Sequence, residues 1–208
     1  MLIQGDVATP QWGSPTQQQV TALLGRFREL GMSPLLPPYA MATLAGYTYH
    51  ASTQAGVALT VALGTVATGF CLSNAPGSGK VLIPLQAAVV CTTAPVGIAV
   101  LGWAFAHHAT TIVTHTTPLV VRSGRLSSLA DMTGDGGFAD SSFTTPATQV
   151  AIRPIPGGPV ATGSISDANT VDDFDGSMVL MPGASLSTFC LTTAISAIIS
   201  MSWLALPL

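Results

Sequence analysis

ISMSWLALPL, at residues 199–208, alternates between two kinds of side chain, and this alternation points to the fold. Successive side chains of a β-strand point to opposite faces of its sheet, so every second residue shares a face. One face of this segment carries Ser200, Ser202 and Leu204. The other face is apolar and is formed by Ile199, Met201, Trp203 and Ala205. The segment therefore predicts a strand with one face in a hydrophobic core.

Similar strand-like segments recur over most of the chain, from about residue 45 onward. Short runs rich in Val, Ile and Thr alternate with clusters of Gly, Pro, Asn, Asp and Ser, and no strand–helix alternation appears. Many short strands separated by turn residues predict an antiparallel β-sandwich or barrel and disfavour a doubly wound α/β fold. The predicted strands cover residues 57–71, 80–91, 96–105, 110–114, 118–122, 148–153, 177–181, 185–191 and 194–206.

Two long stretches carry few strand signals. Residues 123–147 include the sequence GDGGFADSSFTTP, and residues 154–176 are rich in Gly, Pro and Asp. We predict that both are long loops, which in a compact domain usually serve an interface or a binding role. We expect them to project to solvent or to contact a neighbouring structure.

The first 45 residues have a different character and contain one predicted helix. Ser14 is a suitable N-cap, and Pro15 fits the first helical position. We therefore predict an amphipathic helix at residues 15–30, within an N-terminal arm of residues 1–45 that precedes a β-domain at residues 46–208. The apolar face of this helix, which we expect to bind a partner protein, consists of Val20, Leu23, Leu24, Phe27 and Leu30.

The composition limits the classes of partner. Only 7% of the residues are charged, against about 25% in typical soluble proteins, and 48% are hydrophobic. Such a chain fits either a membrane protein or a subunit that buries much of its surface against other proteins. A membrane span needs about 18 continuous apolar residues, and polar residues or prolines interrupt both candidate segments, 81–105 and 186–208. The net charge of −3 offers no basic surface for nucleic acid. We therefore predict protein partners, without membrane or direct nucleic-acid contact.

The sequence NAPGSGK, at residues 74–80, contains glycines and the only lysine of the chain in an order like that of a phosphate-binding loop. That loop has the pattern GxxxxGK[ST] and opens a helix. Here Asn74 replaces the first glycine, Val81 replaces the hydroxyl residue, and the following VLIPLQAAVV favours a strand. Without a helix N-terminus there is no amide cradle for phosphate. We predict a turn that leads into a strand, with Lys80 at its solvent edge and no nucleotide cofactor.

Two clusters contain metal-ligating residue types, but neither has a complete ligand set. His107, His108 and His115 lack an evident fourth ligand, although three copies of one histidine could meet on a trimer axis. An acidic segment resembles a calcium loop but has Val171 and Pro182 where acidic ligands are required, so we interpret it as an acidic turn. A calcium site of another kind stays open, with candidate ligands Asp167, Asn169, Asp172, Asp173 and Asp175. We predict no metal and no other cofactor.

The sequence shows no catalytic constellation. Its aspartates fall in turn-like segments, no GxSxG elbow occurs, and no nucleophile has an obvious partner histidine. Cys71, Cys91 and Cys190 are odd in number and widely spaced, so we interpret them as buried free thiols. We predict that the protein is not an enzyme.

Three motifs resemble those of jelly-roll virion proteins from tailed bacteriophages. They are the turn at residues 74–80, the strand entry PGASLS at residues 182–187, and a final strand with Ser202-Trp203 followed by Pro207. The resemblance covers roughly residues 50–208. Those proteins often carry acidic residues after the tryptophan, whereas this chain has Leu204-Ala205-Leu206, which favours a more buried last strand.

The resemblance implies an all-β fold, a jelly-roll β-sandwich of about eight strands that follows an N-terminal arm with one short α-helix. It implies a capsid cement or decoration protein that binds the major capsid protein as a homotrimer and resides in the virion, assembled in the host cytoplasm. We expect the mostly uncharged sheet faces to be subunit contacts.

Two alternatives to a decoration protein stay open. One is a tail or head-fibre appendage of the same fold that binds a host receptor through its loops, and the other is a non-viral lectin-like binding module. Exposed aromatic side chains in the two long loops would favour the receptor-binding appendage, which would use its loops to hold a host glycan. The aromatic residues available there are Phe138, Phe143 and Phe174.

Overall fold

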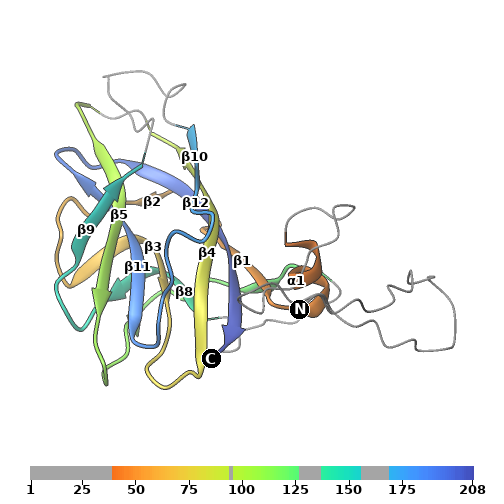
Figure 1. Cartoon of the computed structure of the whole chain (residues 1–208). Helices are drawn as coiled ribbons and strands as arrows, with labels where there is room; N and C mark the ends of the chain where they lie inside the picture. Colours follow the sequence, from red (N-terminus) through yellow and green to blue (C-terminus); the bar gives the residue numbers. More distant parts are fainter. Residues whose placement is uncertain (1–38, 94–95, 127–136, 156–168) are drawn as a thin grey trace, which may run out of the picture. The chain divides into compact units, whose positions relative to one another are not determined.

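The computed structural model describes residues 39–93, 96–126, 137–155 and 169–208 (Figure 1). The chain divides into two compact units, Met1–Ala40 and Met41–Leu208, and the description below concerns the second unit. The amphipathic helix predicted at residues 15–30, with its proposed binding face, lies outside the described residues and stays a prediction.

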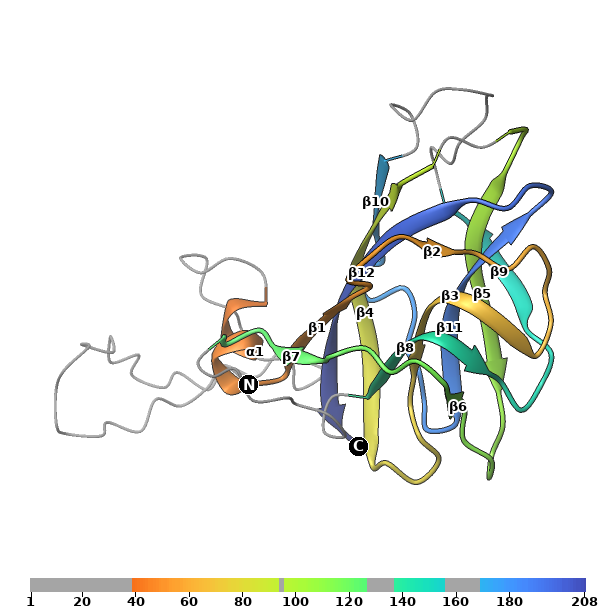
Figure 2. The ribbon, with the colours of Figure 1, turned by 180° about the vertical axis from the view of Figure 1, so that it is seen from behind.

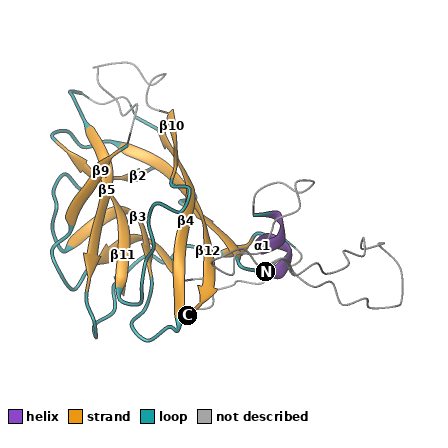
Figure 3. Ribbon diagram, in the orientation of Figure 1, coloured by secondary structure: helices purple, strands orange, loops and turns teal. Residues whose placement is uncertain are grey.

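The described residues form two antiparallel sheets and one short helix, α1 (Ala40–Ala45), which is drawn in purple in Figure 3. In order across the first sheet lie β10 (Asn169–Asp173), β4 (Lys80–Cys91), β12 (Ser196–Pro207), β1 (Thr48–Ser52) and β7 (Arg122–Ser123), and β2 (Val57–Ala58) also pairs with β12. Across the second sheet lie β6 (Thr114–His115), β8 (Phe138–Thr144), β3 (Val66–Ser73), β11 (Ala184–Leu191), β5 (Val100–His107) and β9 (Val150–Pro154).

Eight of these strands have the order of a jelly roll. One sheet contains β1-β12-β4-β10 and the other contains β3-β11-β5-β9 as neighbours. Along the chain these strands alternate between the sheets, except that β9 follows β5 within the second sheet. This arrangement gives the two Greek keys of a jelly roll. Strands β8 and β6 extend the second sheet beyond β3 (Figure 2). The predicted all-β sandwich with a short helix is confirmed.

The hydrophobic core lies between the two sheets. Its largest fully buried side chains include Trp103 of β5, Trp203 of β12 and Phe70 of β3. The alternation predicted for residues 199–205 is confirmed, because the four apolar residues of β12 are at most 4% exposed: Ile199, Met201, Trp203 and Ala205. Each fully buried large apolar side chain contributes roughly 1.5–3 kcal/mol, so this face anchors the last strand firmly in the sandwich.

Strands with continuous apolar patterns were predicted well. The range predicted for residues 80–91 is confirmed as β4, and those at 185–191 and 194–206 correspond to β11 and β12. The range 57–71 instead splits into β2 and β3. The prediction of a strand at 177–181 is wrong, because within it only Leu180 pairs, in an isolated bridge with Leu82.

Two strands lie where the sequence predicts loops. Strand β8 falls within residues 123–147, and β10 falls within residues 154–176. Both carry aspartates, which are rare in strands. In each strand one carboxylate is buried and satisfied by hydrogen bonds from other segments, those of Asp140 and Asp172. Tertiary contacts therefore override a weak local strand preference.

Candidate interaction surface and polar clusters

The segment 74–80 forms a turn, as predicted, and β4 starts at Lys80. The Asn74 side chain donates hydrogen bonds to the carbonyl oxygens of Lys80 and Leu180, and its own oxygen accepts one from Ser78 Oγ. Gly77 and Gly79 have positive φ angles of 74° and 65°, a conformation that favours glycine. These glycines therefore serve a tight turn into a strand, since no helix follows.

The three histidines considered as candidate metal ligands do not converge. The His107 ring stacks on Phe105, His108 Nδ1 accepts a hydrogen bond from the Thr111 N–H, and His115 lies in a separate cluster described below. Within the described part of the chain, no group of three His, Cys, Asp or Glu residues could hold a metal ion.

The acidic segment also lacks a shared metal position. Asp172 is 6% exposed and faces the core, whereas its neighbour Asp173 is exposed on the outer face. Asp175 adopts a positive φ of 45° in the following turn, which agrees with the prediction of an acidic turn. Asp167 and the side chain of Asn169 lie outside the described residues.

A partly buried ion pair joins the two sheets at their β9 and β10 edges. Arg153 of β9 donates from Nη2 to Asp172 Oδ1, and the Trp103 indole donates to Asp172 Oδ2 at 2.6 Å. The guanidinium of Arg153 also lies over the ring of Phe174, with its carbon 4.9 Å from the ring centroid. Each carboxylate oxygen therefore has a donor from the opposite sheet, so this cluster holds the sandwich together at that edge.

A second polar cluster, on the outer side of the second sheet, contains a serine, a histidine and an aspartate. His115 Nδ1 lies 3.2 Å from Asp140 Oδ2, and His115 Nε2 lies 3.2 Å from Ser73 Oγ. Because a carboxylate accepts, Nδ1 carries the proton and Nε2 accepts from the serine hydroxyl. The backbone N–H groups of Thr117 and Ser142 donate to the other Asp140 oxygen at 3.0 and 2.8 Å.

This arrangement has the bonding order of a hydrolase triad but also satisfies a buried charge. Asp140 is fully buried, and Ser73 is only 3% exposed. Acyl transfer also needs an accessible hydroxyl and N–H donors for the oxyanion. Burial lowers the pKa of His115, and the charge of Asp140 opposes that change. The cluster ties β6 to β8 and β3, which is a structural role.

Sequence reasoning missed both polar clusters. It placed the aspartates in turns and found no partner for a histidine, whereas Asp140 lies in β8 and contacts His115. The members of each cluster come from distant strands, so no short motif could have revealed them. The three cysteines are free and buried, as the sequence suggests. Burial raises the pKa of the Cys190 thiol to about 11, which keeps it protonated and unreactive.

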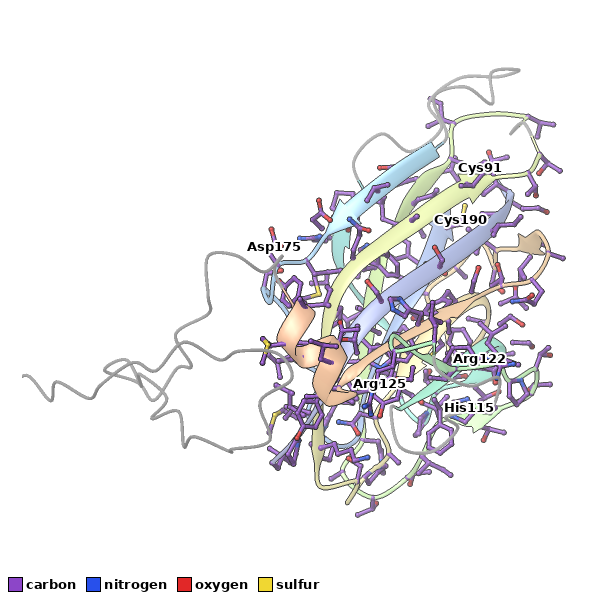
Figure 4. All side chains as sticks on the ribbon, turned by 90° about the vertical axis from the view of Figure 1, so that its right-hand side faces the viewer. Cys91, His115, Arg122, Arg125, Asp175 and Cys190 are labelled. Atoms are coloured by element: carbon purple, nitrogen blue, oxygen red, sulfur yellow. The ribbon has the colours of Figure 1, made fainter. Side chains whose placement is uncertain are left out.

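The outer face of the first sheet carries a row of polar residues that crosses five of its six strands in register. Asp173 is opposite Gln86, Gln86 is opposite Ser202, Ser202 is opposite His50, and His50 is opposite Arg122. We call these five residues the polar row. One end of the row is acidic and the other is basic, and its middle is uncharged. Figure 4 looks onto this face, with Asp175 and Arg122 on opposite sides of it.

Next to the polar row, the same face carries small or apolar side chains and no charge. The neighbouring row places Val171 opposite Ala88, Ala88 opposite Ser200, and Ser200 opposite Ser52. Val171 is 57% exposed and Val90, one row further, is 42% exposed. A depression of about 610 Å³ lies beside this row, towards β7. Its lining includes His50, Ser52, Val120, Arg122, Leu126 and Ser200.

The comparisons with known proteins found no relative of this chain. No protein-family model, no curated protein and no solved structure matches it at a significant level. Among the described residues, no helix is both long and apolar enough to span a membrane.

Proposed function

We propose that this protein is a virion structural protein, a capsid cement or decoration protein of a tailed phage. The observation that carries the proposal is the outer face of the first sheet, where Val90 and Val171 are more than 40% exposed and charge is confined to the edges. Antiparallel sheets usually turn a polar face to water, so exposed valines on a face with little charge indicate a protein contact. The assignment to a virion comes from the sequence motifs alone.

Such a protein acts by binding the assembled shell and not its free subunits, which stabilises the shell by mass action. In the proposal, the apolar face of residues 15–30 binds the major capsid protein, and the β-sandwich joins copies of the chain. Several copies held together multiply weak shell contacts through their effective concentration. Three copies per assembly, as the resemblance implies, is part of this proposal.

Receptor binding through loop aromatics is a weaker candidate. Of the three aromatic residues that could bind a glycan, Phe143 and Phe174 are each 1% exposed and belong to the interior. Only Phe138 reaches the surface, where it is 38% exposed and packs beside the His115 ring. A glycan site needs an accessible aromatic surface, so burial excludes two of the three candidate phenylalanines.

Capsid binding tests the proposed function. In the full-length chain, Leu23→Asp with Phe27→Asp places two charges on the predicted helix face, whereas the control Gln18→Asp lies on its opposite face. We expect the double variant to lose co-sedimentation with heads of the encoding phage by at least about tenfold, because desolvating two carboxylates opposes binding. The control should bind normally. Equal binding by all three proteins would contradict the proposed anchor.

A further inference from the structure

The two ends of the polar row have opposite charges and lie on opposite edges of one sheet. Asp173 belongs to the edge strand β10 and Arg122 to the edge strand β7, with β12 midway between them. Ser202 of β12 is the central residue of the row. The row therefore reads acid, amide, hydroxyl, imidazole and guanidinium from one edge to the other.

This order makes the face complementary to a copy of itself. A two-fold axis along β12 turns a second sheet face-down and exchanges its edges while keeping each row at the same height. Asp173 of each copy then lies opposite Arg122 of the other, Gln86 lies opposite His50, and Ser202 lies opposite itself. A two-fold axis across the strands would instead bring like charges together, which is unfavourable.

The apolar residues beside the row fit the same operation. Val171 projects from the β10 edge, and the depression lined by Val120 and Leu126 lies on the β7 edge. The two-fold axis along β12 places the valine of each copy over the depression of the other. In the middle, Ala88 lies opposite Ser52 and Ser200 opposite itself, and such small side chains allow the sheets to approach closely.

We propose that a second copy of this chain binds the outer face of the first sheet, in a symmetric pair whose two-fold axis runs along β12. The contact is of the isologous kind, in which one patch binds its own copy. Sheets packed face to face keep their strands within about 30° of each other, which suits an axis parallel to the strands. The proposal is independent of the virion assignment, since it uses only the surface of the β-sandwich.

Helix α1 leaves these rows accessible. Thr43 Oγ1 of the helix bonds Thr48 Oγ1, two residues before His50 in β1, so the helix lies beyond the polar row on the side away from Ser52. The proposed contact consists of the polar row, which contains His50, and of the neighbouring row, which contains Ser52 and Ser200.

Charge exchange across the proposed contact is the most specific test. Asp173→Arg places four cationic side chains at the two edge contacts, and Arg122→Asp places four acidic ones there. Each single variant should weaken pairing by about tenfold or more, because like charges then face each other. The double variant restores opposite charges and should pair nearly as tightly as the natural chain, which sedimentation equilibrium measures. Failure of the double variant to recover would overturn the proposed geometry, provided that its thermal unfolding is unchanged.

A cross-link at the axis gives a second test that leaves the row intact. Ser200 lies on the two-fold axis, so Ser200→Cys places two thiols across the contact in each pair, whereas the natural cysteines are at most 3% exposed. A short bismaleimide should convert most of the variant to covalent dimer at micromolar concentration. Thr114→Cys, at an exposed position of β6 in the other sheet, is the control and should not be cross-linked. Equal cross-linking of both variants, or none, would exclude pairing at β12 and leave the face to a capsid subunit or to another segment of this chain.

Discussion

At the scale of residues, the described part of the molecule buries two carboxylates, and each one is fully hydrogen-bonded. Asp140 accepts from two backbone N–H groups and faces His115, and Asp172 accepts from Trp103 and Arg153. An isolated buried charge destabilises a fold by several kcal/mol, so such partners are required. In a chain with so few charges, these two aspartates define where segments distant in sequence must meet.

Asp172→Asn tests the inter-sheet ion pair. The amide oxygen can still accept from Trp103, but the partly buried Arg153 loses its counter-charge. We expect the free energy of unfolding to fall by about 1–3 kcal/mol, the range for hydrogen bonds to charged groups. Urea denaturation measures it. Asp175→Asn, at an exposed turn position nearby, is the matched control and should change stability by less than about 0.5 kcal/mol. Equal effects of both changes would contradict a structural role for the pair.

Two histidines whose rings are partly desolvated predict how stability depends on pH. Burial lowers the pKa of His50 and of His115 below the ordinary value of 6.5, although Asp140 opposes the change at His115. As pH falls, the unfolded chain therefore binds protons before the folded protein does. This contribution to stability is complete above pH 6.5 and is lost as pH falls through the lower folded-state values.

Urea unfolding at about pH 7.5 and about pH 5.5 measures this dependence. We expect lower stability at the acidic pH, and a smaller difference in His115→Gln because one titrating group is removed. His107→Gln changes a histidine that is exposed on β5 and serves as the control. If His115→Gln shows the same pH dependence as the natural chain, the attribution to His115 is wrong.

At the scale of elements, the sequence could predict the strands that are defined by apolar side chains. Strands β4, β11 and β12 were predicted because most of their buried residues are apolar. Strands β8 and β10 were missed because their aspartates gain partners only after folding. The polar row could not be predicted from the sequence for a related reason. Its five residues lie on five strands, and their alignment depends on pairings that a single sequence does not specify.

The close contact between β5 and β11 predicts a strong effect at one glycine. A Cβ at Gly102 would lie 2.3 Å from the Phe189 ring and 2.7 Å from the carbonyl oxygen of Arg153. Because the carbonyl belongs to the paired strand β9, Gly102→Ala should displace backbone and lower stability by about 1–3 kcal/mol. In the control Gly64→Ala, the nearest atom is 3.9 Å away, so little change is expected. Thermal unfolding distinguishes the two, and equal melting temperatures would contradict the tight packing.

At the scale of the whole molecule, the described surface carries few charges and few reactive side chains. Charge is sparse, the three thiols are buried, and the one polar cluster with a nucleophile is closed to substrate. The accessible surfaces include the outer face of the first sheet, whose charges lie at its edges and whose central strand carries the small, uncharged side chains of Ser200 and Ser202. The sequence alone led us to expect contacts on the uncharged faces, whereas the proposal of one face and one symmetry depends on the strand register.

The mass of the full-length protein in solution, from light scattering after size exclusion, tests the central claim most directly. A pair has twice the chain mass of 21.1 kDa, about 42 kDa, and a trimer whose chains also pair gives six copies, about 127 kDa. Either mass, shifted to half or less by Asp173→Arg, is the predicted result. A stable monomer of 21.1 kDa, or a trimer near 63 kDa that the variant leaves unchanged, would contradict pairing through the first sheet.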